Sequence, residues 1–381
     1  MSSAAPPAIQ ASLRASALQI TGSPHVRGAL DVPGAMRCVI VAALPCVGMA
    51  IYNAGYQARS APSAGLANAG DWRLGAFEAL GVATTSTQAW VCVAHGAAIL
   101  LPLLVAALLA GGLAERLFAH FRQRDVDHTA LGVIALLFTL CLPPSIPLWQ
   151  AALGGFIAVG VGKEIFGGFG LNFVNPPLVG LAFLYFAYPG ALAGDAVRVA
   201  ADGYTGATPL AAAQLGGLAG LDAAGWTWLE VLLGRVPGAL GETSALACTL
   251  GLAVLLYTGV ASWRVVTGGA LGLVAMAVLI DAAGATPPIA ALPWYWHAVT
   301  DGFAFGLVFL ATDPVTAPVT NSARWLYGLL IGSLVVLLRV ANPAQSESVL
   351  LAVLLGNVMA PLLDQIAARV QLWRRSRTDG R

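Results

Sequence analysis

Long apolar stretches alternate with short polar or Gly/Pro-rich connections along the whole chain. A helix that crosses a bilayer needs about 20 mostly apolar residues, because the hydrocarbon offers the backbone no other hydrogen-bond partners. Ten stretches reach or approach this length, at approximately 36–56, 89–113, 130–143, 146–161, 173–190, 244–261, 265–283, 298–318, 325–340 and 348–367. The pattern predicts an all-α, polytopic membrane protein with about ten transmembrane helices.

The third and fourth stretches are short, and Pro143, Pro144 and Pro147 separate them. A continuous helix does not tolerate prolines at this density, because each removes a backbone donor and clashes with the preceding turn. These two stretches are therefore either two tilted spans or one re-entrant pair.

Composition agrees with the hydrophobic pattern. Of the 381 residues, 58% are apolar and only 10% are charged, whereas an ordinary soluble domain has about 25% charged residues. This excludes a soluble domain and makes the lipid bilayer the natural surroundings of the chain. The formal net charge of +1 provides no field for nucleic acid, so we expect no nucleic-acid partner. The cysteines and histidines show no ligand spacing, and no metal site is predicted.

Arginines at both ends of the chain set the expected orientation, since loops rich in Lys and Arg tend to stay in the cytoplasm. They are Arg14, Arg27 and Arg37 near the start, and Arg369, Arg374, Arg375, Arg377 and Arg381 near the end. Both termini are therefore expected in the cytoplasm, which requires an even number of spans. Nine spans would place the basic tail on the wrong side.

This orientation divides the chain into a cytoplasmic N-terminal segment (1–35), a membrane domain (36–367) and a basic cytoplasmic tail (368–381), with an outer loop at about 191–243. Five spans in each half would give the halves opposite orientations, the arrangement of an inverted repeat. Each half contains a Gly- or Pro-interrupted segment, and in transporters such broken helices line the central binding site.

The first interrupted segment joins the fourth and fifth predicted spans. Its glycines, Gly168 among them, allow a ligand to approach the backbone closely. Asn172 and Asn175 offer amide donors and acceptors that can read the edge of a heterocycle. The alternative interpretation is an ordinary turn between two spans. Lys163 and Glu164 precede the segment, and we expect them to snorkel to the cytoplasmic interface.

Two further segments carry candidate chemistry. In residues 202–210, hydroxyl groups flanked by small residues are accessible to covalent attachment, although strings of small residues are common in membrane proteins. In residues 301–318, Asp313 lies within an otherwise uncharged span directly before Pro314. A carboxylate there is costly unless a cation, donor or water meets it, so its role is either functional or that of a protonated or helix-capping group.

Glu115 and Asp364 stand near the ends of predicted spans. With Asp313 they are the candidate cation ligands, because carboxylate and carbonyl oxygens suit hard cations such as Na⁺. The alternative is that either residue marks a solvated boundary of the membrane.

Taken in order, these segments resemble the B subunit of the Na⁺-translocating NADH:quinone oxidoreductases. Four more stretches look like landmarks of that family, namely residues 23–27, 49–57, 147–154 and 339–343. The resemblance covers about residues 23–376, which is nearly the whole chain.

The resemblance implies a covalent cofactor. In the family, flavin mononucleotide (FMN) is joined through its phosphate to the last threonine of a Ser/Thr-Gly-Ala-Thr motif. Here that residue is Thr208, preceded by Thr205, Gly206 and Ala207, and Asp202 lies just upstream. The charge distribution independently places Asp202 and Thr208 on the outer side of the membrane.

The resemblance also implies a second, noncovalent flavin, riboflavin, in the region of Gly168, Asn172 and Asn175. It links quinone to the glycines near the end of the second span, which are Gly111 and Gly112.

The family's acidic residues tied to Na⁺ uptake match Glu115, Asp313 and Asp364. The implied whole is a six-subunit complex of the bacterial inner membrane that passes electrons from NADH, oxidised on another subunit, through flavins to quinone and exports Na⁺. The chain itself is expected to be inactive without its partner subunits.

Two other interpretations remain open. The D subunit of the Rnf ferredoxin:NAD oxidoreductase is a paralogous flavoprotein with the same threonine motif, and Thr208-Pro209-Leu210 favours it, whereas residues 172–176 and 311–314 fit the B subunit better. A flavin-free channel or permease would suit the composition equally well, and covalently bound flavin distinguishes it from both complexes.

Overall fold

Helices form all the regular secondary structure in the described part of the chain. A computed structural model describes residues 32–60, 72–79, 81–83, 86–123, 126–192, 199, 208–342 and 347–378. Its helices follow the apolar stretches expected from the sequence, and the all-α prediction is confirmed.

The first half of the chain contains α2 (Val32–Ser60), α3 (Trp72–Ala79), α4 (Ala89–Arg122), α5 (His128–Cys141), α6 (Leu148–Val159), the π-helix η2 (Gly160–Glu164), α7 (Pro176–Ala187) and α8 (Pro189–Leu192). The second half contains α9 (Pro209–Ala223), α10 (Trp228–Leu233), α11 (Ala245–Tyr257), α12 (Trp263–Ala282), the 3₁₀ helix η4 (Pro288–Ala291), α13 (Trp294–Val299), α14 (Phe303–Phe305), the π-helix η5 (Gly306–Leu310), α15 (Asn321–Ala341) and α16 (Ser348–Thr378). Two short helices, α9 and α10, thus lie within the predicted outer loop.

Five helices among the described residues are long and apolar enough to cross a membrane, namely α2, α4, α12, α15 and α16. Three shorter apolar helices, α5, α7 and α11, accompany them. The chain is therefore a polytopic membrane protein, and the total of ten spans stays a prediction. At 1.5 Å per residue, α4 is roughly 51 Å long and extends well beyond a hydrocarbon core of about 30 Å.

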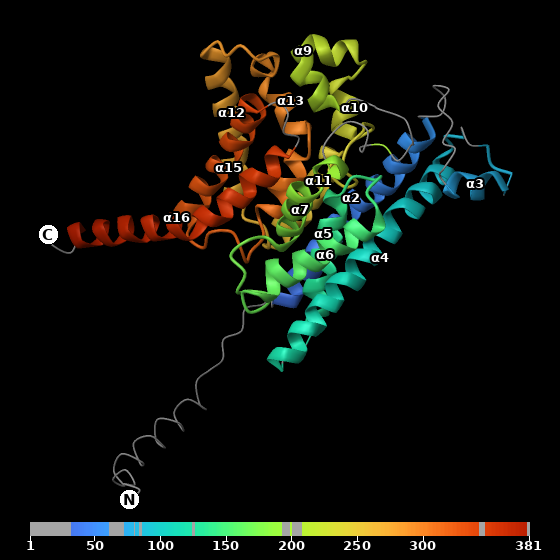
Figure 1. Ribbon diagram of the computed structural model, residues 1–381. Coiled ribbons are helices and arrows are strands. Elements are labelled where there is room, and N and C mark those ends of the chain that lie inside the picture. The colour runs from blue at the N-terminus through green and yellow to red at the C-terminus, as the bar shows by residue number, and fades with distance from the viewer. Residues whose placement is uncertain are drawn as a thin grey trace, which may run out of the picture.

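The helices divide into two groups (Figure 1). Helices α2 and α4–α7, coloured blue to green, lie on one side, whereas α12, α15 and α16, coloured orange to red, lie on the other. Helix α11 packs against α2 on one side and against α14 and η5 on the other, and η5 in turn contacts α12 and α16. At this junction the sulfur atoms of Cys46 and Cys248 are 3.8 Å apart, and both side chains are buried among apolar neighbours.

Glycines bring the helix backbones of the second group into close contact. A Cβ atom added to Gly332 on α15 would lie only 2.0 Å from the carbonyl oxygen of Gly269 on α12. One added to Gly272 would lie 2.3 Å from the carbonyl oxygen of Leu329. Small residues spaced in this way allow the close approach on which helix association in membranes depends.

The predicted stretch 298–318 is interrupted rather than continuous. Asp301 and Gly302 both have positive φ values, of 50° and 66°, and separate α13 from α14. After η5 the chain leaves the helical conformation until α15 begins at Asn321. At the other end, α16 runs through the expected boundary at 367 and ends at Thr378.

Polar side chains begin several helices at the positions where such caps are expected. Asp127 accepts hydrogen bonds from the first backbone N–H groups of α5, and Ser244 does so for α11. Thr208 and Thr320 cap α9 and α15 in the same way. Thr208 is therefore both the candidate for covalent modification and the N-cap residue of α9.

Candidate functional site

The two interrupted segments meet in the fold. In each half, a five-residue π-helix leads into non-helical backbone: η2 into residues 165–175, and η5 into residues 311–319. π-Helices are rare and frequently occur at functional sites. The Nδ2 atom of Asn175, at the end of the first segment, lies 3.3 Å from the carbonyl oxygen of Leu310 and 3.5 Å from Oδ2 of Asp313.

Asp313 is held by its own segment as well as by Asn175. Its Oδ1 accepts a hydrogen bond from Val315 N at 3.2 Å, and its Oδ2 accepts one from Thr316 Oγ1 at 3.2 Å. These bonds fix the carboxylate at the start of a local turn. The structure therefore gives Asp313 a capping role, and it also places this carboxylate beside a cavity.

This cavity, the Asn175 pocket, has an empty volume of about 430 Å³, including the part open to solvent. Its wall is mostly apolar and includes Phe169, Asn175, Phe309, Thr312 and Asp313. Asn175 is 2% exposed, and its Oδ1 accepts no hydrogen bond from any described residue. A buried acceptor without a partner is costly, so Asn175 Oδ1 is suited to a ligand that donates a hydrogen bond.

Asn172 and Gly168 play a different part from Asn175. The side chain of Asn172 accepts a hydrogen bond from Gly170 N at 3.2 Å and donates one to the carbonyl oxygen of Val174 at 3.2 Å. Gly168 is buried with a φ of 106°, a conformation that favours glycine. Both residues thus shape the segment that carries Asn175, and neither lines the pocket.

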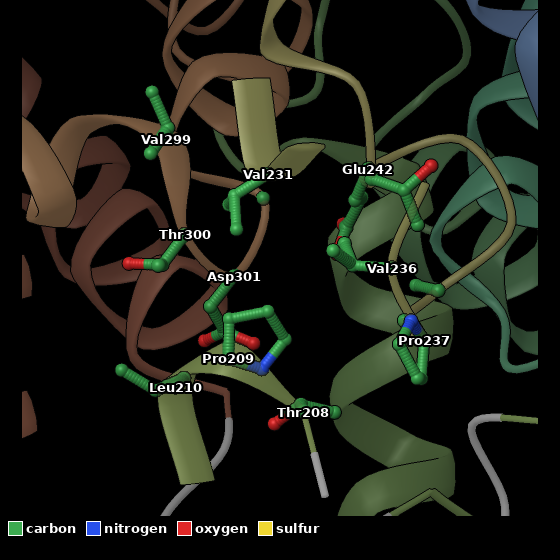
Figure 2. Close-up of a pocket in the computed structure, with 14 residues that line it drawn as sticks. Thr208, Pro209, Leu210, Val231, Val236, Pro237, Glu242, Val299, Thr300 and Asp301 are labelled. Carbon is green, nitrogen blue, oxygen red and sulfur yellow. The ribbon is translucent and has the colours of Figure 1, made fainter. Parts of the chain in front are cut away.

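Thr208 borders a second cavity, the Thr208 pocket, with an empty volume of about 380 Å³ including its open part. Its Oγ1 accepts a hydrogen bond from Ala211 N at 3.1 Å. Figure 2 shows Thr208 and Asp301 near one another, with Val236, Pro237 and Glu242 on the other side of the cavity. The Oγ1 atom of Thr243, another lining residue that is 6% exposed, has no hydrogen-bond partner in the described part of the chain.

The remaining residues of the threonine motif, Asp202, Thr205, Gly206 and Ala207, lie outside the described residues. Helix α10 borders the Thr208 pocket through Val231 and is fixed by a capping box between Thr227 and Glu230. The hydroxyl and N–H groups of Thr227 donate to the Glu230 carboxylate and hold its pKa below its usual value. A capped helix, α10, thus forms part of the wall of the Thr208 pocket.

Glu115 belongs to a buried charged cluster rather than to a solvated boundary. Its Oε1 is 2.7 Å from Lys163 Nζ and accepts a hydrogen bond from Asp127 N at 2.7 Å. Lys163 Nζ is also 3.4 Å from Glu164 Oε1. The expectation that Lys163 and Glu164 snorkel is therefore wrong, because their exposed fractions are 1% and 0%. Their ionic partners replace the water that snorkelling would have reached.

Asp364 anchors the end of the Asp313 segment. Its carboxylate accepts hydrogen bonds from Val319 N at 2.9 Å, from Thr320 N at 2.8 Å and from Thr320 Oγ1 at 2.7 Å. These bonds tie α16 to the start of α15. Asp364 thus holds residues that follow Asp313 in the sequence.

The two glycines on α4, Gly111 and Gly112, differ in how much space surrounds them. A Cβ atom on Gly111 would lie 2.9 Å from Val159 Cγ2 and 3.2 Å from Leu131 Cδ1, so a methyl group there would force these side chains to shift. A Cβ atom on Gly112 would meet Leu131 Cδ2 at an ordinary 3.4 Å. Helix packing accounts for Gly111 and leaves Gly112 unexplained.

Arg339 is a fully buried interhelical partner. Its guanidinium donates to the carbonyl oxygens of His297 at 2.7 Å and Thr300 at 2.8 Å. It also donates to Ser348 Oγ at 3.3 Å. These bonds satisfy the carbonyl groups that the break between α13 and α14 releases, and so they stabilise one wall of the Thr208 pocket.

Several lining residues were not recognised from the sequence, namely Phe169, Glu242, Thr243 and Phe309. Phe169 and Phe309 lie within segments that the sequence singled out, but no pattern marked these two side chains. Glu242 and Thr243 lie outside those segments. Asp301 gave a weak signal, because an Asp-Gly pair within an apolar stretch favours a turn.

Comparisons with known proteins agree with these features. The model of the NQR2, RnfD, RnfE family matches residues 19–372. The B subunit of the Na(+)-translocating NADH-quinone reductase of Pseudomonas aeruginosa (strain LESB58) is 46% identical over 360 residues, covering 93% of this chain and 89% of the relative. The protein of that name from Azotobacter vinelandii is 45% identical over 355 residues (92% and 88%), and that from Chromohalobacter salexigens is 44% identical over 356 residues (93% and 86%). The resemblance seen in the sequence is confirmed, and the chain belongs to the NQR2, RnfD, RnfE family.

Proposed function

We propose that this chain is the membrane flavoprotein known as the B subunit of a Na⁺-translocating NADH:quinone oxidoreductase. The names of relatives up to 46% identical support this assignment. The observation that carries it is the position of Thr208, which begins a helix beside a cavity. We place the protein in a six-subunit complex of the bacterial inner membrane, with both termini in the cytoplasm.

Thr208 fits a phosphodiester-linked FMN on physical grounds. It directly precedes α9, which is helical up to a kink at Gly217, and Ala211 N already donates to its side chain. The first N–H groups of a helix and its dipole favour phosphate, so an esterified Thr208 retains a stabilising environment. The adjacent pocket offers the hydroxyl of Thr243 and the backbone of residues 236–239 to a tethered group. Asp202, Thr205, Gly206 and Ala207 would complete the attachment motif.

The Asn175 pocket fits a noncovalent riboflavin. The unpartnered Oδ1 of Asn175 requires a hydrogen-bond donor, and the imide N–H of an isoalloxazine ring is such a donor. The apolar wall formed by Phe169 and Phe309 suits an aromatic ring. Asn172 and Gly168 would act indirectly, by holding the segment that presents Asn175.

When bound, the flavins would supply electron carriers between an NADH-oxidising partner subunit and quinone. We assign quinone to the region of Gly112 and Gly111. Asp313, Glu115 and Asp364 would serve Na⁺ transport, the first two as direct ligands and Asp364 by anchoring the Asp313 segment. Coupling requires that the affinity for Na⁺ differs between states of the protein, because only differential affinity shifts an equilibrium.

The decisive experiment is the intact mass of the purified chain, followed by mapping of the peptide that contains Thr208. We expect the added mass of one FMN on that peptide, and its loss in Thr208→Ala with the chain still inserted in the membrane. Thr208→Ser is the matched control, because it keeps the hydroxyl and should keep the flavin. Covalent flavin in Thr208→Ala would refute the attachment site, and an unmodified wild-type chain, from cells with the flavin-transferring enzyme, would favour a permease.

A second measurement separates this assignment from the D subunit of an Rnf complex. NADH-dependent quinone reduction by the purified complex that rises with Na⁺ concentration supports the proposed function. Ferredoxin-dependent activity without quinone reduction would assign the chain to the other complex.

A further inference from the structure

Glu115, Lys163 and Glu164 form a carboxylate–lysine cluster in which two acids share one base. Lys163 Nζ lies 2.7 Å from Glu115 Oε1 and 3.4 Å from Glu164 Oε1. The three side chains are at most 2% exposed. Lys163 is also the only lysine in the chain. Lys163 Nζ therefore lies beside two buried carboxylates, in a place where an unmatched charge is costly.

The two carboxylate oxygens of Glu115 differ in their contacts. Glu115 Oε1 interacts with Lys163 Nζ and Asp127 N, whereas Glu115 Oε2 is buried and accepts no hydrogen bond from any residue in the described ranges. A buried carboxylate oxygen without a donor is a ligand that a hard monovalent cation favours. The ammonium group of Lys163 already places a positive charge 2.7 Å from the other oxygen of the same carboxylate.

Arg122 contacts the same region in a different way. Its guanidinium donates to the carbonyl oxygens of Glu164 and Ile165, at the end of η2. In these bonds Arg122 holds the backbone, whereas Lys163 holds a carboxylate oxygen. The two basic residues therefore provide a matched pair for an experiment.

Lys163 is also connected to the rest of the site. It stands in the π-helix η2, which continues directly into the segment that ends at Asn175 beside Asp313. Phe169, in the middle of that segment, lines the Asn175 pocket. A shift of Lys163 can therefore be transmitted to the pocket wall through the short segment that joins η2 to Asn175.

We propose that Lys163 is a tethered competitor of the transported cation at Glu115. Its ammonium group occupies one carboxylate oxygen, and an ion must displace it to bind both oxygens of Glu115. Lys163 then sets the apparent affinity for the ion without taking part in electron transfer. This inference rests on the proposed function, because it concerns the ion that the complex transports.

The test is the Na⁺ dependence of NADH:quinone reduction by the assembled complex with Lys163→Met, an unbranched neutral replacement. Removal of the competitor should lower the KM for Na⁺ by at least about fivefold, the lower end of typical coupling between sites. Lys163→Arg should raise this KM, because a planar guanidinium can hold both carboxylate oxygens at once. A purely structural ion pair would change stability or kcat and leave the KM for Na⁺ in place.

Arg122→Gln is the control, since it removes a nearby positive charge whose hydrogen bonds to this region go to backbone oxygens. It should leave the KM for Na⁺ unchanged. An unchanged or raised KM in Lys163→Met, or an equal decrease in Arg122→Gln, would overturn the proposal. Should Lys163→Met fail to assemble, an unchanged or lowered KM in Lys163→Arg overturns it instead. Absence of Na⁺ stimulation in the wild-type complex would contradict the proposed function itself. Failure of the Lys163 inference, in contrast, would show only in the variants.

Discussion

The side-chain amide of Asn175 lies 3.5 Å from Oδ2 of Asp313, although 138 residues separate them in the sequence. One belongs to the interrupted segment of the first half and the other to that of the second half. The flavin candidate and the cation candidate are therefore neighbours. In a low-dielectric interior, a charge or hydrogen-bond change at one is felt at the other.

Replacement of Asn175 should remove the noncovalent flavin selectively. In Asn175→Ala, the lost hydrogen bonds should weaken flavin binding by about tenfold, consistent with roughly 1.4 kcal/mol for a buried hydrogen bond. The measurement is the ratio of flavin released by acid to flavin that stays attached at Thr208, which serves as an internal standard. A ratio equal to that of the wild type would contradict the assignment of the pocket.

Asn172→Ala provides the matched comparison on the same segment. It removes the bonds to Gly170 N and the Val174 carbonyl, so it should also lower the thermal stability of the segment. We expect both changes to lower stability, because Asn175 Nδ2 also bonds Leu310 O and Asp313 Oδ2, and Asn175→Ala to lower flavin content more, because Asn172 does not line the pocket.

Asp313 and Asp364 should differ in their effects on Na⁺. Asp313→Asn keeps the shape and most hydrogen bonds of the side chain but removes its charge, and should raise the KM for Na⁺ by about tenfold or more. Asp364→Asn weakens the three bonds to Val319 and Thr320, and should cost about 1–3 kcal/mol of stability with a smaller change in that KM. Na⁺ titrations and thermal unfolding of both complexes separate the two roles. Equal KM changes would contradict this division of roles between Asp313 and Asp364.

The five long apolar helices were predictable because the bilayer imposes length and hydrophobicity on each helix separately. The interruption at Asp301 was not, since its positive φ depends on contacts such as those of Arg339 with the released carbonyl groups of His297 and Thr300. The burial of Lys163 depends on Glu115, which lies 48 residues away in the sequence. Sequence patterns therefore identified Thr208, Asn175 and Asp313 as candidates, whereas the walls of their pockets emerged only from the fold.

The close contact between α12 and α15 should make Gly332 sensitive to a single methyl group. A Cβ atom at Gly332 would lie 2.0 Å from the Gly269 carbonyl oxygen, whereas one at Gly48 on α2 has no neighbour within 4 Å. Gly332→Ala should therefore destabilise the protein by about 1–3 kcal/mol, as overpacking does. The identical change Gly48→Ala should be neutral or slightly stabilising. Thermal unfolding of the purified complex compares them, and equal transition temperatures would refute this account of the α12–α15 contact.

The glycine pair on α4 offers a test of the proposed quinone region that is free of packing damage. Gly111→Ala forces a methyl group against Val159 and Leu131, so altered packing could by itself explain a loss of activity. Gly112→Ala meets only an ordinary contact and should fold normally. If quinone approaches the backbone at Gly112, the added methyl group should raise the KM for quinone several-fold, by about 1 kcal/mol, and leave the KM for Na⁺ and the flavin content unchanged. Quinone titrations of the two variants, with thermal unfolding measured alongside, give the comparison. An unaltered KM for quinone in a stable Gly112→Ala complex would remove this region from the quinone site, and Gly111 would then be explained by helix packing alone.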